Sequence, residues 1–465
     1  MKNIKNINRR IIFLTYLFFS FCFPVLLIGQ EKSAQKKLIE FGWDYPTISF
    51  LKNNVNEMQK TPFDGVVFSF DFDIYNAFDT TQRPDLQFQY EDLSEIQWED
   101  FTDNFLFVRG AGYSGAHWLS DKSWDKIVKN LKTVSKALAI SKAKGVGFDP
   151  EYYYKDSTLN PWVYRASWYK GLSYQEVGNY VRKRGKQFIQ ALQTNKPDVK
   201  ILCFWLLGLV SMQNQLYPIT ETGMALYPFF VEGMLKGKNK SSEIIDGNEN
   251  SYGYQTPVSF IESGKYQRKN GAKLIKKSLV SKLQNVSMAQ AIYFDLIYAK
   301  SPAYNKGYDN KTRERWLKNN LYNAFKTTDR YVWFYNEKIN WWKGQVDSGV
   351  AEIIKDVKKQ IITEQNNTDL HVSGKSSIFD FKKDKQNSYQ GFYYNYEKNT
   401  NELQVKLLDK KITRLEIYSN SRLIYTLNDP HLNFVINLNK KYNQKDNLII
   451  MSKDSKGKVS VAYVN

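Results

Sequence analysis

The chain has 465 residues, a formal charge of +19, and a composition that is 42% hydrophobic and 15% aromatic. This length predicts one large domain with a smaller one, and the apolar fraction is sufficient for a sizeable core. With three histidines and two cysteines in the whole chain, metal sites of the Cys/His type are excluded, and we expect neither a metal nor another cofactor.

The first 29 residues predict a secretory signal peptide. Four basic residues precede an apolar run over residues 11–28, and the small residue Gly29 follows that run. An uncleaved membrane anchor is the alternative, because the run has about the length of a short membrane span. Cys22 follows Phe21, where a lipoprotein signal has a small residue, so we do not expect lipidation. After cleavage we expect a secreted, periplasmic or cell-surface protein without stable membrane association, in which Cys203 is a buried free thiol.

Residues 36–366 show apolar runs typical of buried parallel strands, alternating with longer amphipathic stretches. The predicted strands are centred on residues 39–43, 65–70, 104–108, 145–148, 201–206, 243–246, 289–295 and 330–335. The predicted helices cover residues 47–59, 121–142, 173–194, 221–235, 272–283, 311–327 and 348–364. Eight predicted strands that alternate with helices indicate an α/β fold, a (β/α)₈ TIM barrel. A doubly wound open sheet is the alternative, but the sequence lacks its glycine-rich phosphate turn.

The pattern changes after a polar linker at residues 364–370. Short alternating runs, separated by turns rich in Asn, Asp, Lys and Ser, predict a small all-β sandwich over residues 371–465. The runs lie at residues 403–408, 415–418, 423–427, 434–438, 448–451 and 459–464. This module would be either an ancillary glycan-binding domain or a structural cap without a ligand.

Carboxylates accompanied by aromatic residues follow almost every predicted barrel strand, at the end where barrel enzymes place their active sites. The strongest pattern follows the fourth strand, where Asp149 and Glu151 flank Pro150. Two residues apart in an extended chain, these side chains point to the same side, and two close carboxylates tend to separate their pKa values. The alternative is an ion pair with Arg109 or Arg165 and a cap for the next helix.

Other acidic residues at predicted strand ends carry less specific patterns. Glu249 follows the sixth strand and precedes a Tyr-Gly-Tyr loop, and a helix cap or surface role is an equal alternative. Glu337 lies between aromatic runs, where an unpaired charge is costly, so we expect it to bind substrate or to pair with an arginine. The remaining strand-end aspartates are more often structural hydrogen-bond acceptors than catalysts; they are Asp44, Asp71, Asp73 and Asp295.

Paired carboxylates with aromatic residues match the chemistry of glycosidic bond cleavage. One carboxylic acid protonates the leaving oxygen, while a second carboxylate acts as nucleophile, base or stabiliser of the cationic transition state. We expect Asp149 as nucleophile or stabiliser and Glu249 as general acid/base, with Glu151 in reserve for either role. The expected substrate-binding residues are Trp43, Asp44, Arg109, His117, Trp205, Tyr252, Glu337, Trp341 and Trp342. Basic residues 182–184 are interpreted as the solvated face of their helix.

Five segments carry a resemblance to a known family, namely FGWDYPTISFLKNN, PFDGVVF, KGVGFDPEYY with NPW, DGNENSYGY and YVWFYNEKINWW. They resemble secreted bacterial TIM-barrel glycoside hydrolases from about Leu38 to Trp342, which covers the barrel and not the β module. More specifically, the chain resembles glycoside hydrolase family 168, whose members are endo-acting fucanases on sulfated fucan. The resemblance implies a retaining mechanism with two carboxylates close together, and it assigns that family's catalytic pair to no particular residues here.

The basic charge, about +15 without the signal peptide, predicts an anionic partner. Because no nucleic-acid-binding motif is present, we expect an anionic, sulfated polysaccharide and no nucleic acid. Two other functions stay open. One is a non-catalytic glycan-binding protein on a degenerate barrel, and the other is a polysaccharide lyase with Tyr252 or His117 as its base.

Overall fold

The computed structural model describes residues 35–71, 76–80, 87–110, 118–153, 159–254, 256–299, 308–366, 392–397, 399–408, 410–430, 433–438 and 448–464. The predicted signal peptide, most of the predicted linker, Asp73 and His117 lie outside these residues. Among the described residues, no helix combines the length and the hydropathy that a membrane span requires.

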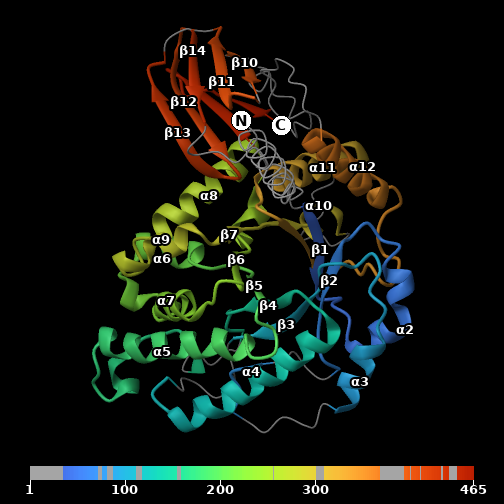
Figure 1. Cartoon of the computed structure of the whole chain (residues 1–465), viewed down its shortest axis with the longest axis vertical. Helices are drawn as coiled ribbons and strands as arrows, with labels where there is room; N and C mark the ends of the chain where they lie inside the picture. Colours follow the sequence, from blue (N-terminus) through green and yellow to red (C-terminus); the bar gives the residue numbers. More distant parts are fainter. Residues whose placement is uncertain are drawn as a thin grey trace, which may run out of the picture. The chain divides into compact units, whose positions relative to one another are not determined.

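Parallel strands surrounded by helices form the larger part of the chain (Figure 1). The strands are β1 (Lys37–Gly42), β2 (Gly65–Phe68), β3 (Phe105–Arg109), β4 (Gly145–Asp149), β5 (Lys200–Cys203), β6 (Glu243–Asp246), β7 (Ser287–Met288), β8 (Gln290–Tyr293) and β9 (Tyr331–Asn336). Each from β1 to β6 pairs with the next, and β1 also pairs with β9. The (β/α)₈ barrel predicted from the sequence is therefore confirmed.

The seventh strand of the barrel is interrupted at Ala289. The segment before the interruption, β7, pairs with β6, whereas the segment after it, β8, pairs with β9. The N–H of Ala289 donates a 2.8 Å hydrogen bond to the carbonyl of Asp246, which keeps the interrupted residue attached to β6. Because β7 and β8 are consecutive, the two ends of the sheet meet and the barrel closes.

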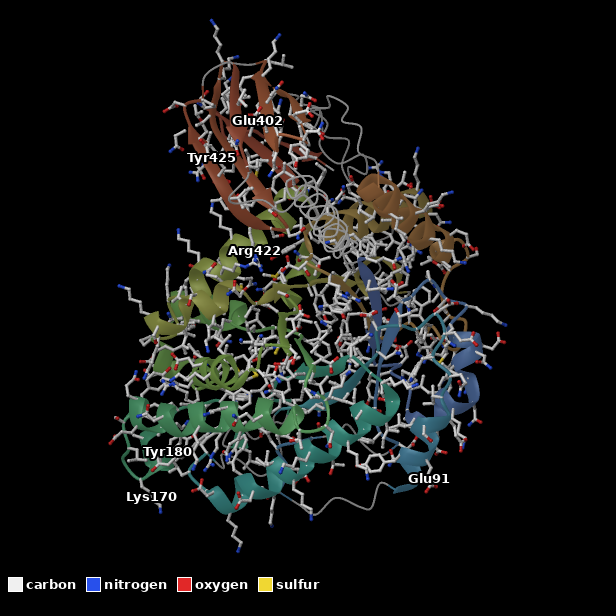
Figure 2. All side chains as sticks on the ribbon, in the orientation of Figure 1. Glu91, Lys170, Tyr180, Glu402, Arg422 and Tyr425 are labelled. Atoms are coloured by element: carbon white, nitrogen blue, oxygen red, sulfur yellow. The ribbon has the colours of Figure 1, made fainter. Side chains whose placement is uncertain are left out.

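The helices around the barrel carry side chains such as Glu91 and Tyr180 that project outward (Figure 2). They are α2 (Ile48–Met58), α3 (Gln87–Glu95), α4 (Asp121–Ser141), α5 (Tyr174–Leu192), α6 (Gly208–Leu216), α7 (Tyr227–Gly237), α8 (Pro257–Gly271), α9 (Val280–Gln284), α10 (Asp295–Tyr298), α11 (Asn310–Thr327) and α12 (Val350–Asn366). Helix α5 begins with a capping box, in which Ser173 is the N-cap and Glu176 its partner.

The helix predicted over residues 272–283 is wrong. The chain instead forms α8 earlier, after Thr256, whose side chain caps the helix, and with Pro257 in its first turn. A proline at this position fits the missing hydrogen-bond donor of a first helical turn. Within residues 272–283 the only α-helical residues belong to the short α9. Helices α3 and α6 were also missed, and α7 begins at Tyr227 rather than at residue 221.

The solvated face predicted for residues 182–184 is also wrong for both arginines. Arg184 is fully buried, and its guanidinium donates to the carbonyl of Trp118 and pairs with Asp121 at 2.7 Å. Arg182 is buried against Glu232 of α7. Because α5 and α7 pack closely, a cation on this face of α5 is buried and requires a partner.

Seven antiparallel strands form two sheets near the C-terminus. One sheet contains β10 (Phe392–Glu397), β11 (Glu402–Leu407) and β14 (Asn433–Asn437). The other contains β13 (Arg422–Asn428), β12 (Ile412–Ser419), β15 (Leu448–Asp454) and β16 (Val459–Val464). Alternate residues from both sheets share one apolar core, so the predicted all-β sandwich is confirmed, with β10 as an additional strand.

The other face of the four-stranded sheet packs on α8 of the barrel. Tyr418, Ile449, Met451 and Val461 form a buried apolar cluster with Ile261 of α8. Along β15, Leu448 and Ile450 point into the sandwich, whereas Ile449 and Met451 point to α8. This alternation buries both faces of the sheet.

Candidate active site

A pocket of about 420 Å³, including its open mouth, lies where barrel strands end and their loops begin. Residues from β1, β3, β4 and β9, and from the segments after β1, β4, β5 and β6, line it. The lining residues are Phe41, Gly42, Trp43, Tyr45, Phe107, Arg109, Asp149, Tyr153, Phe204, Glu249, Tyr252, Trp333 and Tyr335. Five of the twelve residues predicted for the site are among them, namely Asp149, Glu249, Trp43, Arg109 and Tyr252.

Four aromatic side chains pack against one another among these lining residues. Phe41 stacks on Phe204 with ring centroids 4.2 Å apart, and Phe204 lies 4.9 Å from Trp333. Phe107 contacts Phe41 edge to face at 5.2 Å. These side chains exclude water from the barrel interior, which lowers the local dielectric constant and penalises any charge placed there.

Asp149, the last residue of β4, is 5% exposed and lines the pocket. Its carbonyl accepts a 2.7 Å hydrogen bond from the N–H of Gly110, which extends the ladder between β3 and β4. Its side chain accepts a 2.8 Å hydrogen bond from the N–H of Glu151. The next residue, Pro150, is held by a 2.6 Å bond from Trp162 Nε1 to its carbonyl. The chain therefore turns immediately after Asp149, and Glu151 is not among the residues that line the pocket.

Arg109 and Tyr153 complete the surroundings of Asp149. The guanidinium of Arg109 lies 4.7 Å from the centre of the Tyr153 ring, and both residues line the pocket. The Tyr153 hydroxyl is hydrogen-bonded to the carboxylates of Asp149 and Glu151. Arg109 is 8% exposed, and its Nε has no hydrogen-bond acceptor among the described residues. The pocket therefore holds one cation beside its acidic residues.

Glu249 enters the pocket from the loop after β6, and its backbone is fixed to the end of β5. The N–H of Gly247 donates to the carbonyl of Cys203 at 2.6 Å, and the N–H of Glu249 donates to the carbonyl of Phe204 at 3.1 Å. Between them, Asn248 has a left-handed backbone with φ of 48°. Asparagine tolerates this conformation better than most residues. The turn at Asn248 thus sets the position from which the Glu249 side chain extends.

The pKa values of the two pocket carboxyls are raised to different extents. Burial raises the pKa of Asp149 to about 6, and the charge of Glu151 adds to the rise, whereas the Glu151 N–H and Arg109 oppose it. Burial raises the pKa of Glu249 to about 8, and the charges of Glu151 and Asp149 contribute. At pH 7, Glu249 is therefore mostly protonated and Asp149 mostly ionised. A protonated and an ionised carboxyl in one pocket suit an acid and a nucleophile or base.

Aromatic residues at the pocket offer surfaces for a ligand. Trp43 is 52% exposed. Tyr252 stacks on Tyr335 at 5.2 Å, and Tyr293 packs 5.0 Å from Tyr252. An exposed indole beside stacked phenols presents both flat apolar faces and hydroxyl groups.

Two of the predicted ring platforms are corrected by the structure. Trp205 is 4% exposed and packs 5.1 Å from Tyr227, and Trp341 is 8% exposed and packs 4.7 Å from Phe63. Neither offers a face to a ligand. The half-buried Trp342 packs on the same core, 6.5 Å from Phe63. All three lie outside the pocket lining, so a tryptophan near a strand end was insufficient evidence of exposure.

The other predicted acids hold the backbone in place. Asp44 accepts hydrogen bonds from Asn336 Nδ2 at 2.7 Å and from the N–H of Trp341 at 2.8 Å, outside the pocket lining. Asp295 accepts from the N–H groups of Glu337 and Lys338 at 2.7 and 2.6 Å.

Two further predicted acids lie outside the pocket lining. Asp71 accepts a 2.9 Å hydrogen bond from the N–H of Ser49, in the first turn of α2. Glu337 accepts a 3.2 Å hydrogen bond from the Tyr335 hydroxyl. Glu337 therefore contacts the lining residue Tyr335 and is not itself part of the lining.

Several pocket residues were not predicted from the sequence. Tyr153 and Tyr335 lie two residues from acids that the sequence did single out, Tyr153 after β4 and Tyr335 near the end of β9, so their place close to a strand end was the available signal. In the sequence, Phe204 and Trp333 cannot be distinguished from other apolar residues of predicted strands. Their side chains point into the barrel only because the sheet closes. Among the described residues, no three His, Cys, Asp or Glu side chains come together as a metal site.

Fold and site together define a (β/α)₈ barrel with an aromatic pocket that holds two acidic side chains with separated pKa values. No protein-family model and no curated protein sequence matches the chain. The resemblance to glycoside hydrolase family 168 therefore stays a prediction.

Solved structures to which this chain is similar include a mannosidase, an endoglucanase and a glucuronidase. One is an exo-beta-1,4-mannosidase from Opitutaceae bacterium strain TAV5, with 10% identity, a TM-score of 0.41, and coverage of 71% of this chain and 60% of that one. A GH5-4 broad specificity endoglucanase from an uncultured bacterium has 9% identity, a TM-score of 0.39, and coverage of 68% and 85%. A calcium binding mutant of Bacteroides uniformis beta-glucuronidase 2 has 8% identity and a TM-score of 0.39 over 92% of this chain, which spans 45% of that protein. Likenesses at this level carry no information on the reaction or substrate of this chain.

Proposed function

We propose that this protein is a glycoside hydrolase in which Asp149 and Glu249 cleave the glycosidic bond. The observation that supports this most strongly is the pair itself, because both carboxyls line one pocket and their pKa values of about 6 and about 8 lie on either side of neutrality. Hydrolysis of a glycosidic bond needs one carboxyl that is protonated and one that is ionised at the same pH.

In this proposal Glu249 protonates the leaving oxygen, and Asp149 acts as the nucleophile or stabilises the positive charge at the sugar carbon. Tyr153 and Arg109 hold the Asp149 carboxylate ionised, through a hydrogen bond and an opposite charge. Trp43 stacks against a sugar ring at the pocket mouth, and Tyr252 and Tyr335 contact its hydroxyls. The closely packed aromatic floor excludes bulk water, which strengthens these electrostatic interactions.

The substrate class we propose is an anionic, sulfated polysaccharide such as sulfated fucan, attacked within the chain by a secreted enzyme. Arg109 supports an anionic substrate, since it is the one basic residue among those that line the pocket. A guanidinium binds sulfate or carboxylate through paired hydrogen bonds. The retaining mechanism implied by the family resemblance would assign the nucleophile to Asp149 and both proton transfers to Glu249.

Of the two other functions, a lyase with a tyrosine base fits the site less well. Burial raises the pKa of Tyr252, and the charge of Glu249 adds to the rise, so a tyrosinate at this position is disfavoured. A lectin-like pocket has no requirement for two acids with separated pKa values. These observations favour hydrolysis over both.

The test is a panel of sulfated fucan, its desulfated counterpart, a uronate polymer and a neutral glucan, incubated with the wild-type protein. Release of reducing ends from the anionic polymers without ultraviolet-absorbing products would support the proposal. Unsaturated products would identify a lyase instead. Binding without any product would identify a non-catalytic glycan-binding protein.

A further inference from the structure

Glu249 is connected to the C-terminal sandwich by a continuous path of buried hydrogen bonds. The path begins at Asn248, whose turn places Glu249 in the pocket. Both ends of the Asn248 side-chain amide are engaged, because its Nδ2 donates to Gln290 at 2.7 Å and its Oδ1 accepts from Gln267 at 2.9 Å. Asn248 is 1% exposed, so these contacts are shielded from water. They fix the side chain of a residue whose backbone is left-handed.

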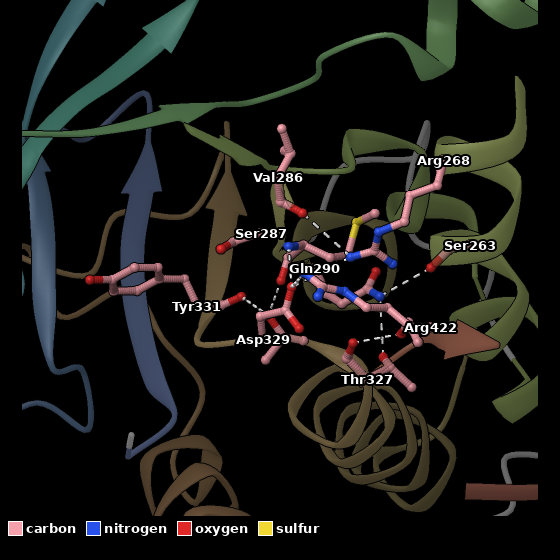
Figure 3. A network of polar contacts seen from close by, with 12 residues as sticks. Ser263, Arg268, Val286, Ser287, Gln290, Thr327, Asp329, Tyr331 and Arg422 are labelled. Atoms are coloured by element: carbon pink, nitrogen blue, oxygen red, sulfur yellow. Dashed lines mark hydrogen bonds and ion pairs between the residues drawn. The ribbon is translucent and has the colours of Figure 1, made fainter. Parts of the chain in front are cut away.

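Gln290, in β8, is the centre of this path (Figure 3). Its Oε1 accepts from Asn248, and its Nε2 donates to Ser263 of α8 at 3.1 Å and to Thr327 of α11 at 3.2 Å. Gln290 is fully buried. A buried amide with all these partners holds a single orientation, since any rotation leaves polar groups without partners. We call Asn248, Gln267, Gln290, Ser263 and Thr327 the Gln290 network.

The sandwich contacts this network directly through the turn between β12 and β13. Ser421 in that turn is fully buried and donates a 2.6 Å hydrogen bond to the carbonyl of Thr327. The turn fits against α8 at Gly264, where an added Cβ would lie 2.5 Å from the Ser421 Cβ. Ser421 also has a positive φ of 59°. Any residue larger than glycine at position 264 would therefore collide with this turn.

Charged groups flank the same contact. Arg422 and Arg268 lie 3.8 and 3.5 Å from the carboxylate of Asp329, which also accepts a 2.7 Å hydrogen bond from the N–H of Met288 in β7 (Figure 3). On α8, Lys265 pairs with Glu416 of β12 at 3.1 Å. The sandwich is thereby attached to the part of the barrel that carries the Glu249 loop.

We infer that the sandwich, through Ser421 and the Gln290 network, positions the Glu249 side chain for catalysis, and that Gln290 and Thr327 are positioning residues. This inference rests on the proposed function only for the role of Glu249. It assigns the module a use other than glycan binding. Loss of the path would allow the Asn248 turn to relax and water to reach Glu249.

Two matched pairs of variants of the full chain test the inference. Thr327→Val removes the hydroxyl that accepts from Gln290, whereas Thr327→Ser retains it. Ser421→Ala removes the donor from the sandwich, whereas Ser452→Ala removes a buried serine of β15 whose hydroxyl has no hydrogen-bond partner in the described structure. Thermal unfolding of all four variants identifies any that fail to fold, and either Thr327→Val or Ser421→Ala, compared with its own control, suffices for the test.

Two readouts are compared. The first is kcat and KM for the glycan found in the panel. The second is independent of activity, namely the pH midpoint at which Glu249 reacts with a carbodiimide, followed by mass spectrometry of the modified peptide. Other titrating groups near Glu249 are Asp149, Glu151, Tyr252 and Tyr335, and none is altered in these variants.

We expect Thr327→Val and Ser421→Ala to lower kcat at least fivefold with KM changed less than twofold. We also expect the labelling midpoint of Glu249 to move to lower pH, while Thr327→Ser and Ser452→Ala match the wild type. Identical midpoints and kcat values in all five proteins would overturn the inference. If the wild type cleaves no glycan, the proposed function fails, and the labelling midpoint alone still decides whether the path positions Glu249.

Discussion

The backbone N–H of Glu151 donates a 2.8 Å hydrogen bond to the side chain of Asp149, two residues earlier in the chain. This bond turns the chain away from β4 at the residue where the strand ends. It leaves Asp149 in the pocket and places Glu151 outside the lining, where its charge still acts on the pocket. One of the two acids in this motif therefore faces the pocket, and the other adjusts the electrostatic environment of that pocket.

The pH–rate profile follows from the two pocket carboxyls. Asp149, with a pKa of about 6, loses its nucleophilic form as pH falls below that value. Glu249, with a pKa of about 8, loses its proton as pH rises above that value. We expect a bell-shaped profile of kcat/KM with limbs near these values and a maximum near pH 7. A rate that increases steadily from pH 6 to pH 9 would contradict this assignment.

Arg109→Met tests the anionic part of the substrate. Loss of the guanidinium should raise KM about tenfold for a sulfated glycan, which corresponds to roughly 1.4 kcal/mol, with a smaller change for the desulfated form. Because Arg109 lowers the pKa of Asp149, its removal should also move the acidic limb of the pH profile to higher pH. Equal losses on both glycans would show that Arg109 does not bind the anionic group.

Substitution of Trp43 and of Trp341 should have different effects, one on ligand binding and the other on the stability of the fold. Trp43→Ala removes a side chain that is 52% exposed, so KM should rise with little change in the melting temperature. Trp341→Ala leaves a cavity at a residue that is 8% exposed, and should cost about 3–5 kcal/mol of stability. Thermal unfolding and KM measured for both variants check this. A raised KM for Trp341→Ala without loss of stability, together with loss of stability for Trp43→Ala, would instead identify Trp341 as the residue that contacts the ligand.

Glu40→Gln should change the pH dependence of stability. Glu40 is fully buried, and burial raises its pKa well above the ordinary value, with the charge of nearby Asp44 adding to the rise. A raised folded-state pKa stabilises the protein at low pH, and this contribution is lost as pH rises through the folded-state pKa.

Glutamine has nearly the shape of the protonated acid and no proton to lose. The stability of Glu40→Gln relative to the wild type should therefore increase from pH 5 to pH 8. Urea unfolding at the two pH values measures this. A difference that is independent of pH would show that Glu40 is ionised in the folded protein.

The strands were predictable from the sequence because buried parallel strands are apolar on both faces, which gives short runs such as residues 243–246. The interruption at Ala289 was not predictable, because it depends on how β6 and β9 approach each other when the barrel closes. Helix α8 was missed although Thr256 and Pro257 form a recognisable start, because its apolar periodicity is weak.

The acidic residues of the site were predictable in part. Asp149 and Glu249 follow apolar strands, and position after a strand was a sufficient signal for both. The same signal also selected Asp44 and Asp295, whose oxygens accept backbone hydrogen bonds. Only the three-dimensional arrangement separates an acid that faces a pocket from one that holds a loop. The contact between Ser421 and Thr327 joins residues 94 positions apart, and no local pattern indicates it.

The leaving-group dependence of hydrolysis tests the roles of Asp149 and Glu249 most directly. Glu249→Gln should lose a factor of about 10² to 10⁴ in kcat/KM on the natural glycan and stay near the wild type on a dinitrophenyl glycoside of the same sugar, which needs no acid. Asp149→Asn should be impaired on both substrates, and the exposed-surface control Glu91→Gln on neither. Wild-type rates on the glycan for Asp149→Asn and Glu249→Gln would contradict hydrolysis by this pair.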